Sequence, residues 1–480
     1  MKKILTAVCL ILVIVLNCFA LASCGDSNST ETKDSGSAFV PDEGLTYDGS
    51  EVEITFYHTM GANLRTVLDK YVAKFNEMYP NIKIVHSQEG GYDDVRDKIS
   101  TELTVGNQPN IAYCYPDHVA LYNLAGSVVT LDSFINSKAE VTKADGSKEV
   151  LGFTEAQIAD FIDAYYNEGK EFGDGKMYTL PLSKSTEVLY YNKTFFDANN
   201  LSVPTTWDEL ETLCAQILTI DPNCIPLGYD SEANWFITMA EQLKSDYTSA
   251  EAGNHFLFDN ETNRNFVKRF SEWHQKGYVT TQEIYGAYTS GLFVAQTGTK
   301  SYMSIGSSAG ATHQRPAATD DGSYPFEVGI ATIPQADASN KKVISQGPSL
   351  CIFNNASQQE VVASWLFVKY LTSCVEFQAE FGMVSGYVPV LESVAQNPVY
   401  AEFINTANGG DNIAALSAKV CLEQKDAYYT SPAFNGSSEA RDQVGALLQF
   451  CMVEYKNASD KDAMIKKAFE DAVAECEYMS

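Results

Sequence analysis

The stretch EVEITFY at 51–57 alternates polar and apolar residues, as a strand with one buried face does. Apolar residues then recur at helical spacing over 63–79, and NIKIVH at 81–86 predicts a second strand. A second helical pattern covers 92–104, and PNIAYCY at 109–115 predicts a third strand. Strands that alternate with helices predict an α/β fold with a parallel sheet covered on both faces. Ligand groups are then expected beyond the carboxyl ends of the strands.

The rest of the chain is largely helical by the same criterion. Four segments carry apolar residues at three- and four-residue spacing, which predicts helices over 207–219, 265–276, 359–372 and 460–476. Between them lie short runs typical of strands, at 187–191, 300–305, 326–330 and 349–353. No internal repeat is present, so a surface adhesin built from repeats is not favoured. A chain of 480 residues predicts two or more domains.

The N-terminus carries an export signal. Lys2 and Lys3 precede an uncharged apolar run over 4–16, which is too short for a spanning helix but typical of a signal peptide. The following LASCG at 21–25 resembles a bacterial lipobox, in which Cys24 is acylated and becomes the mature N-terminus. We therefore expect a signal peptide over 1–23 and a lipidated, flexible tether over 24–49, with the protein anchored to the extracytoplasmic face of the cell membrane.

Composition excludes one class of partner and leaves the cysteines in two alternative roles. The formal net charge of −29 repels polyanions, so no nucleic acid partner is expected.

The cysteines show no CxxC pair and no zinc-ligand spacing, and neither a metal nor a cofactor is expected. A bridge between Cys214 and Cys224 is one interpretation. The other is that the dispersed cysteines are small buried hydrophobic residues.

Three groups of motifs, in order along the chain, resemble the bacterial extracellular solute-binding protein family that serves ABC importers of sugars. The first group is DGKMYTLP (174–181), VLYYNK (188–193) and PTTWDEL (204–210). The second is FVAQTGTKSYM (293–303) and GSSAG (306–310), where Tyr302 replaces the usual alanine and the spacing is stretched. The third is VGIATIP (328–334), GPSLCIF (347–353), ASWLFVKYL (363–371) and SGYVP (385–389).

The resemblance implies a two-lobed periplasmic-binding-protein-like fold of type II with a hinge between the lobes. We expect an N-terminal lobe from 50–185 and 346–385, and a C-terminal lobe from 186–345 and 386–480. Crossing segments are expected near 184–187, 345–347 and 385–386. The resemblance also implies a monomer that closes over a small-molecule ligand and delivers it to the permease of an ABC importer.

Within the family the chain is most similar to the glycerol-3-phosphate-binding branch. Residue by residue, this resemblance implies six ligand contacts: Tyr92, Asp117, Ser185, Ser307, Gly347 and Tyr387. That branch holds the phosphate with an arginine near the C-terminal helix, but TSPAFNG at 430–436 contains no basic residue. A neutral sugar or polyol is therefore the preferred ligand, unless Lys184 or Arg315 substitutes for the arginine.

The residues themselves add further candidates, because a sugar site needs aromatic faces and fixed hydrogen-bonding groups. Tyr57 and His58 end the first strand, and Trp235 is a candidate stacking platform. Ser307 and Ser308 either contact ligand or cap the following helix. For each tyrosine, ordinary core packing is the alternative role.

Two other functions stay open at this point. One is a binding protein for glycerol 3-phosphate or a glycerophosphodiester. The other is a secreted glycan-active enzyme, for which an acidic pair such as Asp93 and Asp94 is weak support in a chain with 62 acids. No GxSxG, HExxH, P-loop or EF-hand motif is present, so we expect no catalytic residues.

Overall fold

A computed structural model describes residues 39–40, 45–251, 253–409 and 412–479. The expected signal peptide (1–23), the lipidation site Cys24 and most of the tether (24–49) lie outside these residues. The residues that the structure describes form one compact unit, because contacts between them run throughout this part of the chain. The division into lobes at residues 185, 345 and 385 therefore stays a prediction, although two separate sheets organise this unit.

The smaller sheet has five strands in the order β2-β1-β3-β13-β6. In that order they are Ile82–Gln88, Val52–His58, Ile111–Cys114, Ser349–Ile352 and Leu180–Pro181. β1 runs parallel to both β2 and β3, whereas β13 is antiparallel to β3 and β6. The expected β-α-β-α-β opening is confirmed, with the helices α2 (Ala62–Met78) and α3 (Tyr92–Leu103) between these strands.

The larger sheet has seven strands in the order β14-β12-β7-β10-β8-β9, with β11 also paired to β7. In chain order they are β7 (Ser185–Asn192), β8 (Leu227–Tyr229), β9 (Val279–Thr281), β10 (Met303–Ser307), β11 (Val328–Thr332), β12 (Val343–Gln346) and β14 (Tyr428–Tyr429). The sequence predicted β7, β10, β11 and β13 within a few residues. It missed β9, β12 and β14, which are two to four residues long and carry little periodicity.

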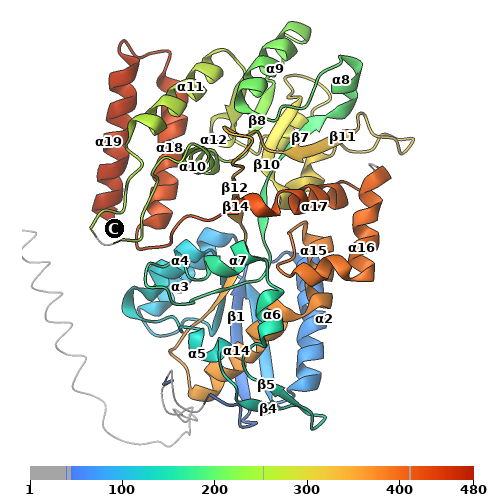
Figure 1. Ribbon diagram of the computed structural model, residues 1–480, viewed down its shortest axis with the longest axis vertical. Coiled ribbons are helices and arrows are strands. Elements are labelled where there is room, and N and C mark those ends of the chain that lie inside the picture. Colours follow the sequence, from blue (N-terminus) through green and yellow to red (C-terminus); the bar gives the residue numbers. More distant parts are fainter. Residues whose placement is uncertain (1–38, 41–44, 252, 410–411, 480) are drawn as a thin grey trace, which may run out of the picture. The chain divides into compact units, whose positions relative to one another are not determined.

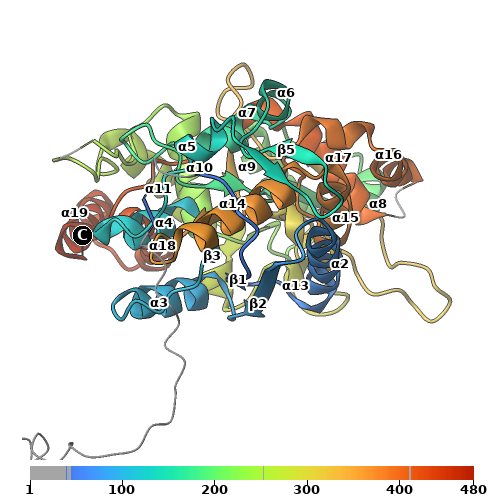
Figure 2. The same ribbon diagram turned by 90° about the horizontal axis from the view of Figure 1, so that it is seen from below.

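Helices cover both sheets (Figures 1 and 2). Around the smaller sheet lie α2, α3, α4 (Pro116–Tyr122), α5 (Asp132–Ile135), α6 (Glu155–Ala159), α7 (Asp163–Glu168), α14 (Gln358–Ser373) and α15 (Val375–Ser385), with the hairpin β4 (Glu140–Thr142) and β5 (Lys148–Val150). With the larger sheet lie α8 (Lys193–Ala198), α9 (Trp207–Ile220), α10 (Glu232–Gln242), α11 (Glu261–Gln275), α12 (Gln282–Tyr285), α13 (Ser290–Phe293), the 3-10 segment η2 (Ser308–Gln314), α16 (Pro398–Asn405), α17 (Ile413–Glu423), α18 (Ser437–Glu454) and α19 (Lys461–Met479). The four longer helices expected from periodicity are confirmed as α9, α11, α14 and α19.

Local chemistry explains where α9 begins. The Thr206 hydroxyl accepts a hydrogen bond from the Glu209 N–H at 3.2 Å, and the Glu209 carboxylate accepts one from the Thr206 N–H at 3.2 Å. This reciprocal capping box satisfies two backbone donors that the helix would otherwise leave unpaired. Trp207, in the first turn, is buried in the core as its position on an amphipathic helix predicts.

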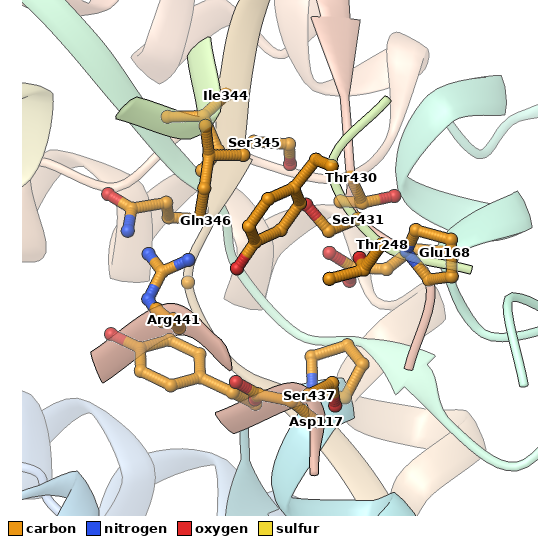
Figure 3. A pocket seen from close by; sticks show the side chains of 16 residues that line it. Asp117, Glu168, Thr248, Ile344, Ser345, Gln346, Thr430, Ser431, Ser437 and Arg441 are labelled. Atoms are coloured by element: carbon orange, nitrogen blue, oxygen red, sulfur yellow. The ribbon is translucent and has the colours of Figure 1, made fainter. Parts of the chain in front are cut away.

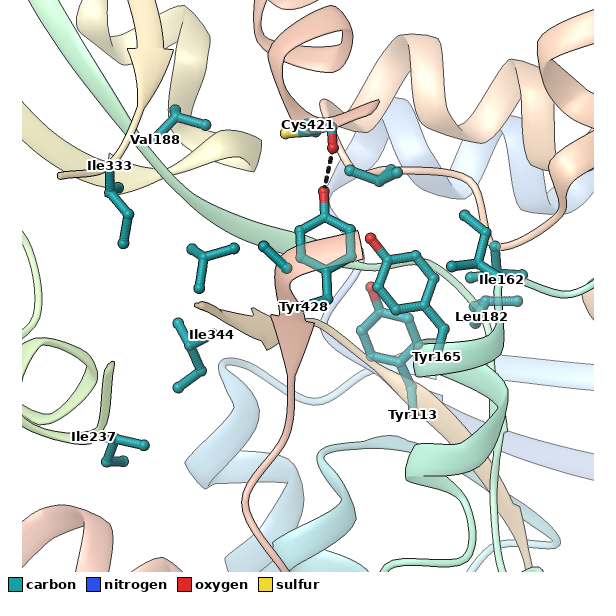
Figure 4. Packing of buried hydrophobic residues seen from close by; sticks show 14 of the residues in the cluster. Tyr113, Ile162, Tyr165, Leu182, Val188, Ile237, Ile333, Ile344, Cys421 and Tyr428 are labelled. Carbon is teal, nitrogen blue, oxygen red and sulfur yellow. Dashed lines mark hydrogen bonds between the residues drawn. The ribbon is translucent and has the colours of Figure 1, made fainter. Parts of the chain in front are cut away.

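A continuous apolar core joins the two sheets. Tyr113 of β3, Tyr165 of α7 and Tyr428 of β14 pack within one cluster (Figure 4). The rings of Tyr165 and Tyr428 stack 5.2 Å apart, and the Tyr428 hydroxyl donates to the Cys421 carbonyl at 2.6 Å. Side chains of this core therefore also occupy the region where the chain passes from one sheet to the other.

The cysteines of the described residues are free thiols, so the Cys214–Cys224 bridge is not formed. Seven of these eight cysteines are buried, and Cys374 is half-buried. They act as small core residues, the second of the two interpretations. Burial raises the pKa of the Cys224 thiol to about 12, so that it stays protonated at neutral pH.

Candidate ligand-binding cleft

A cleft of about 960 Å³ lies beyond the carboxyl ends of strands from both sheets. The smaller sheet contributes the start of α3 and the segment from Tyr115 to His118, which follows β3. The larger sheet contributes residues after β8, β10 and β12 and from the start of α18. The volume falls in the range of small-molecule sites, and the position matches the expectation for open α/β sheets.

An aromatic platform forms the wall on the side of the smaller sheet. The rings of Tyr92 and Tyr115 stack 4.1 Å apart at 18°, and Tyr113 continues the stack 5.7 Å from Tyr92. The hydroxyls of Tyr92 and Tyr387 lie 3.2 Å apart, so Tyr387 fixes the platform from behind. Such a preordered ring face can pack against the apolar face of a sugar ring.

Asp230 forms a fixed acceptor on the opposite wall. Its Oδ1 accepts hydrogen bonds from the N–H and the hydroxyl of Thr289, both at 2.7 Å. The Gln314 amide approaches its Oδ2 at 3.5 Å, while the Oε1 of Gln314 is buried and has no hydrogen-bond partner. Burial raises the pKa of Asp230. This corner of the cleft therefore offers one buried acceptor without a donor, the Gln314 Oε1, beside the fixed carboxylate of Asp230, and ligand hydroxyl groups can donate to both.

A polar network crosses the floor of the cleft. Asn234 and Gln346 exchange two hydrogen bonds of 2.9 and 3.0 Å, and Arg441 donates to the Asn234 Oδ1. Glu187 accepts a hydrogen bond of 2.5 Å from the Tyr229 hydroxyl. Burial raises the pKa of Glu187 to about 7, and Arg441 opposes this rise. The amide pair and the guanidinium hold one another in place, as a preorganised ligand site requires.

A smaller inner cavity of about 70 Å³ adjoins the cleft (Figure 3). It shares Tyr115, Asp117, Gln346 and Arg441 with the cleft. The hydroxyl groups of Ser345 and Thr248 lie buried in its wall without a hydrogen-bond partner. At about 30 Å³ per water molecule, the inner cavity has room for two waters or for one small polar group of a ligand.

Four of the residues implied by the family resemblance lie in these cavities. Tyr92, Asp117 and Ser307 line the cleft, and Gly347 lines the inner cavity. Gly347 has φ +101°, and a Cβ there would lie 2.8 Å from the Ser183 carbonyl oxygen, so only glycine fits. Ser307 also caps η2, because its hydroxyl accepts from the Ala309 N–H at 3.2 Å. Ligand contact by the four residues stays a prediction.

Trp235 is placed differently from our expectation. Its side chain is 0% exposed and stacks between Phe270 at 3.9 Å and Tyr229 at 4.7 Å. It is therefore a core residue and not a stacking platform. α10 starts after a strand exit and points its first residues at the cleft, but the residue that reaches the cleft is Asn234, the preceding position.

Tyr57 and His58 also lie away from the cleft lining. The Tyr57 ring is covered by Lys98, whose Nζ lies 4.3 Å from its centroid, and faces α3. His58 is fully buried and its Nε2 lies 2.9 Å from the Nδ1 of His86. The strand β1 alternates its side chains, and both residues point into the layers that cover the sheet, not past its end.

Ser185, Ser308 and Tyr387 support the cleft without lining it. Ser185 is buried and pairs with Gln346 in the ladder between β7 and β12. The buried Ser308 hydroxyl accepts a hydrogen bond from the Thr186 N–H at 3.2 Å. Tyr387 contacts the platform through Tyr92. Their positions fix the residues that do line the cleft.

The phosphate argument from the sequence needs a correction. The segment 430–436 has no basic residue, but Arg441 lines the inner cavity together with Thr430 and Ser431. Lys184 cannot substitute, because its ammonium group is buried against Glu168. Arg315 lies 3.6 Å over the Tyr324 ring and is not among the lining residues. The cleft thus has a cation that our inspection of 430–436 alone could not find.

Asp230 and Asn234 were also missed, although both had a signal. Asp230 directly follows β8, and Asn234 lies in the first turn of the next helix, where ligand groups of α/β sheets gather. Sequence reasoning assigned this strand exit to Trp235 and not to its polar neighbours Asp230 and Asn234. Of the acidic pair at the start of α3, Asp93 lines the cleft and Asp94 caps the helix, accepting from the Gly91 N–H at 2.8 Å.

Two further properties of the described residues bear on function. No cluster of three or more His, Cys, Asp or Glu side chains within them is suited to hold a metal ion. None of the helices that the structure describes combines the length and apolarity needed to span a bilayer.

Comparison with known proteins gives one family. The family model of the bacterial extracellular solute-binding proteins matches residues 70–407. The sn-glycerol-3-phosphate-binding periplasmic protein of Yersinia pestis is 24% identical over 374 residues, which cover 75% of this chain and 79% of that protein. The same protein of Salmonella typhimurium is 28% identical over 193 residues, or 39% of this chain. That shorter match spans 40% of the length of the Salmonella protein.

Solved structures show the same fold. The cyclic α-maltosyl-1,6-maltose binding protein from Arthrobacter globiformis has a TM-score of 0.67 and 21% identity, covering 89% of this chain and 100% of that one. The glycerophosphocholine complex of a Mycobacterium tuberculosis protein has a TM-score of 0.65 and 17% identity, covering 89% and 98%. At these identities the likeness establishes the fold alone, a two-lobed α/β fold of the type II periplasmic binding proteins, as expected.

Proposed function

Because the chain belongs to the bacterial extracellular solute-binding protein family, we propose that it captures a mono- or oligosaccharide or a polyol for an ABC importer. The observation that carries this proposal is the pair of oxygen acceptors at Asp230 and Gln314, which line the same cleft as the Tyr92–Tyr115 platform. The Oε1 of Gln314 has no hydrogen-bond partner, and the Asp230 carboxylate is held in place by Thr289. Ring stacking on one wall and fixed acceptors on the other are the two requirements of a sugar site.

The charges that line the cleft favour a neutral ligand. Five carboxylates line it, against two guanidinium groups: Asp93, Asp117, Glu187, Asp230 and Asp442 against Arg96 and Arg441. Arg96 already pairs with Asp93 and Asp97 at 3.1 and 2.9 Å. A dianionic phosphate would enter a site with an excess of negative charge, whereas hydroxyl groups donate readily to carboxylates.

The proposed mechanism is capture by closure. Each sheet carries part of the cleft wall, so a ligand that contacts both walls binds the closed form more tightly and shifts the equilibrium toward it. The closed monomer would then present both lobes to the membrane permease. Acylation of Cys24 would hold the protein at the extracytoplasmic face of the membrane, and no catalytic step is part of this function.

A second candidate ligand is a phosphate ester such as glycerol 3-phosphate or a glycerophosphodiester. Arg441 favours it, because this guanidinium lies where the cleft meets the inner cavity and beside the first residues of α18. The positive end of a helix dipole and a guanidinium together suit an anion. The curated relatives from Yersinia and Salmonella carry this ligand in their names.

A thermal-shift screen tests both candidates on residues 25–480. The screen contains monosaccharides, oligosaccharides, polyols, glycerol 3-phosphate and glycerophosphodiesters, and sugar release is assayed in parallel. A ligand at 100 times its Kd stabilises the fold by about 2.7 kcal/mol, which a melting curve resolves. A neutral sugar that binds without turnover supports the proposal. Release of sugar by turnover contradicts the proposal. A response to phosphate esters alone would mean that the ligand is a phosphate ester and not a neutral sugar.

We expect the substitution Asp230→Asn to weaken sugar binding by about 10- to 100-fold, because hydrogen bonds to a charged acceptor contribute about 1.5–3 kcal/mol. Asparagine keeps an oxygen for the two Thr289 hydrogen bonds, so the local structure should persist. Titration calorimetry with the sugar found in the screen measures the effect. Asp471→Asn, on the exposed face of α19, is the matched control and should leave Kd unchanged. Equal affinities for both variants would remove Asp230 from the site.

The substitution Arg441→Gln separates the two ligand classes. If the ligand is a phosphate ester, loss of the charge-assisted bonds should weaken binding by about 100-fold or more. If the ligand is a neutral sugar, we expect about 10-fold or less, because the glutamine amide can still donate. Glycerol 3-phosphate and the sugar from the screen are titrated in parallel. A loss greater for the sugar than for the phosphate ester would contradict the role given to Arg441.

A further inference from the structure

Three segments of the chain meet at Lys184, where the chain passes between the two sheets. Residues 182–184 join β6 to β7, and residues 347–348 join β12 to β13. The third segment, at 387–388, follows α15. The Lys184 N–H donates to the Val388 carbonyl at 3.0 Å, and the Val388 N–H donates to the Lys184 carbonyl at 2.5 Å. The backbone of Lys184 is thus bonded to the third segment in both directions.

The side chain of Lys184 bonds to the second segment. Its Nζ donates to the Gly347 carbonyl and to the Ser349 hydroxyl, both at 3.1 Å, and forms an ion pair with Glu168. A lysine ammonium group has three donors, so these three acceptors saturate it. The Ser349 hydroxyl also donates to Glu168 at 3.2 Å. Lys184 is 0% exposed and Glu168 is buried, so both charges are removed from bulk solvent.

The backbones at this point are in direct contact. A Cβ on Gly347 would lie 2.9 Å from the Lys184 Cα and 3.1 Å from the Ser185 N. No side chain separates the first two segments, and the ammonium group of Lys184 fastens them from the side. A buried ion pair is a weak source of stability, because desolvation opposes its Coulomb energy. The Lys184–Glu168 pair is therefore better explained by a role in fixing the geometry of the crossing segments than by a gain in stability.

We propose that Lys184 is a positioning residue, which holds the three crossing segments together and so defines the axis about which the lobes turn. The inference rests on capture by closure. Glu168 and Gly347, two partners of the ammonium group, also line the inner cavity. The proposed axis therefore runs beside the inner cavity, between the wall that carries the platform and the wall that carries Asp230.

The test compares variants of residues 25–480 without ligand. Lys184→Met alone leaves the Glu168 carboxylate buried without a cation and can prevent folding. The double variant Lys184→Met with Glu168→Gln removes both charges at similar volume and is the main test. Lys369→Met is the matched control, because Lys369 is also buried but donates to the Val150 carbonyl, away from the crossing segments.

Hydrogen exchange read by mass spectrometry measures the effect at the segments themselves, and small-angle scattering measures the spread of lobe positions. In the double variant we expect peptides that contain residues 184 and 388 to exchange at least tenfold faster, and the scattering to require a broader distribution of radii. Peptides from β1 should exchange as in the unmodified protein. Lys369→Met should change neither measurement at the crossing segments.

Unchanged exchange at residues 184 and 388 together with unchanged scattering would overturn the inference, even if the melting temperature falls. A fall in stability alone is what a merely structural lysine would give. Failure of the proposed function is a separate outcome, because it would be seen in the ligand screen of the unmodified protein. The exchange and scattering measurements need no ligand.

Discussion

Replacing Trp235 by alanine is expected to lower the free energy of unfolding by about 3–5 kcal/mol, the usual cost of truncating a buried aromatic side chain. The indole ring fills the space between α10 and α11, where it contacts Phe270 and Trp273, and it stacks on Tyr229 of β8. Alanine would leave a cavity among rigid rings that cannot close it. Urea unfolding followed by far-UV circular dichroism measures the loss.

The neighbouring residue provides the control. Asn234 lines the cleft and bonds to Gln346 and Arg441, so Asn234→Ala should weaken ligand binding and change the stability much less than Trp235→Ala does. Of these two adjacent substitutions, Trp235→Ala should mainly lower the stability, and Asn234→Ala should mainly weaken ligand binding. If Trp235→Ala abolished binding and left the unfolding midpoint unchanged, Trp235 would be the stacking platform that we expected from the sequence.

The fold was largely predictable because long elements repeat their pattern often enough. α2 and α9 each bury one face over three turns or more, and their positions were found within a few residues. The strands β8, β9 and β14 have two or three residues and carry no such pattern. The residues that follow β9 and β14 could therefore not be assigned to strand ends in advance.

The site was harder to predict than the fold, since cleft and core use the same residue types. Tyr92 and Trp235 both follow a strand exit, yet Tyr92 lines the cleft and Trp235 is buried beneath it. Successive residues of a helix point about 100° apart, and this is why Asn234 reaches the cleft while the next residue of α10, Trp235, lies in the core. Which of two adjacent residues is buried depends on tertiary packing, and neither residue spacing nor a family motif specifies that packing.

Arg441 shows the same limit for charge. The segment 430–436 contains no cation. The helix α18 then places Arg441 more than one turn after its start at Ser437, against that same segment. A side chain that returns to a site from a helix cannot be located from a segment considered by itself. The ligand class depends on this geometry.

His58, expected to lie at the ligand, is instead the inner member of a buried chain of hydrogen bonds. The Met60 N–H donates to the His58 Nδ1 at 3.1 Å, so the Nε2 of His58 carries the proton and donates to the His86 Nδ1. The His86 Nε2 then donates to the Asp69 carboxylate at 2.8 Å. His58 is neutral in this arrangement, and a second proton on it would have no acceptor.

Stability is therefore expected to fall as the pH is lowered from 7 to 4. Burial, followed by the neighbouring His86 and Arg65, lowers the pKa of His58 from 6.5 to about 4, an effect that Glu89 opposes. Between these two values the unfolded chain binds the proton and the folded chain does not, so protons favour unfolding. A shift of this size corresponds to about 3 kcal/mol, present above pH 6.5 and lost by pH 4.

Urea unfolding at several pH values, with His58→Asn beside the unmodified protein, isolates this contribution. Asparagine can accept the Met60 hydrogen bond but does not titrate, so its stability should fall by about 3 kcal/mol less over the same pH range. The carboxylates contribute equally to both proteins and cancel in the difference. Parallel curves for His58→Asn and the unmodified protein would mean that His58 accepts a proton in the folded state, and the neutral His58 inferred from its hydrogen bonds would be wrong.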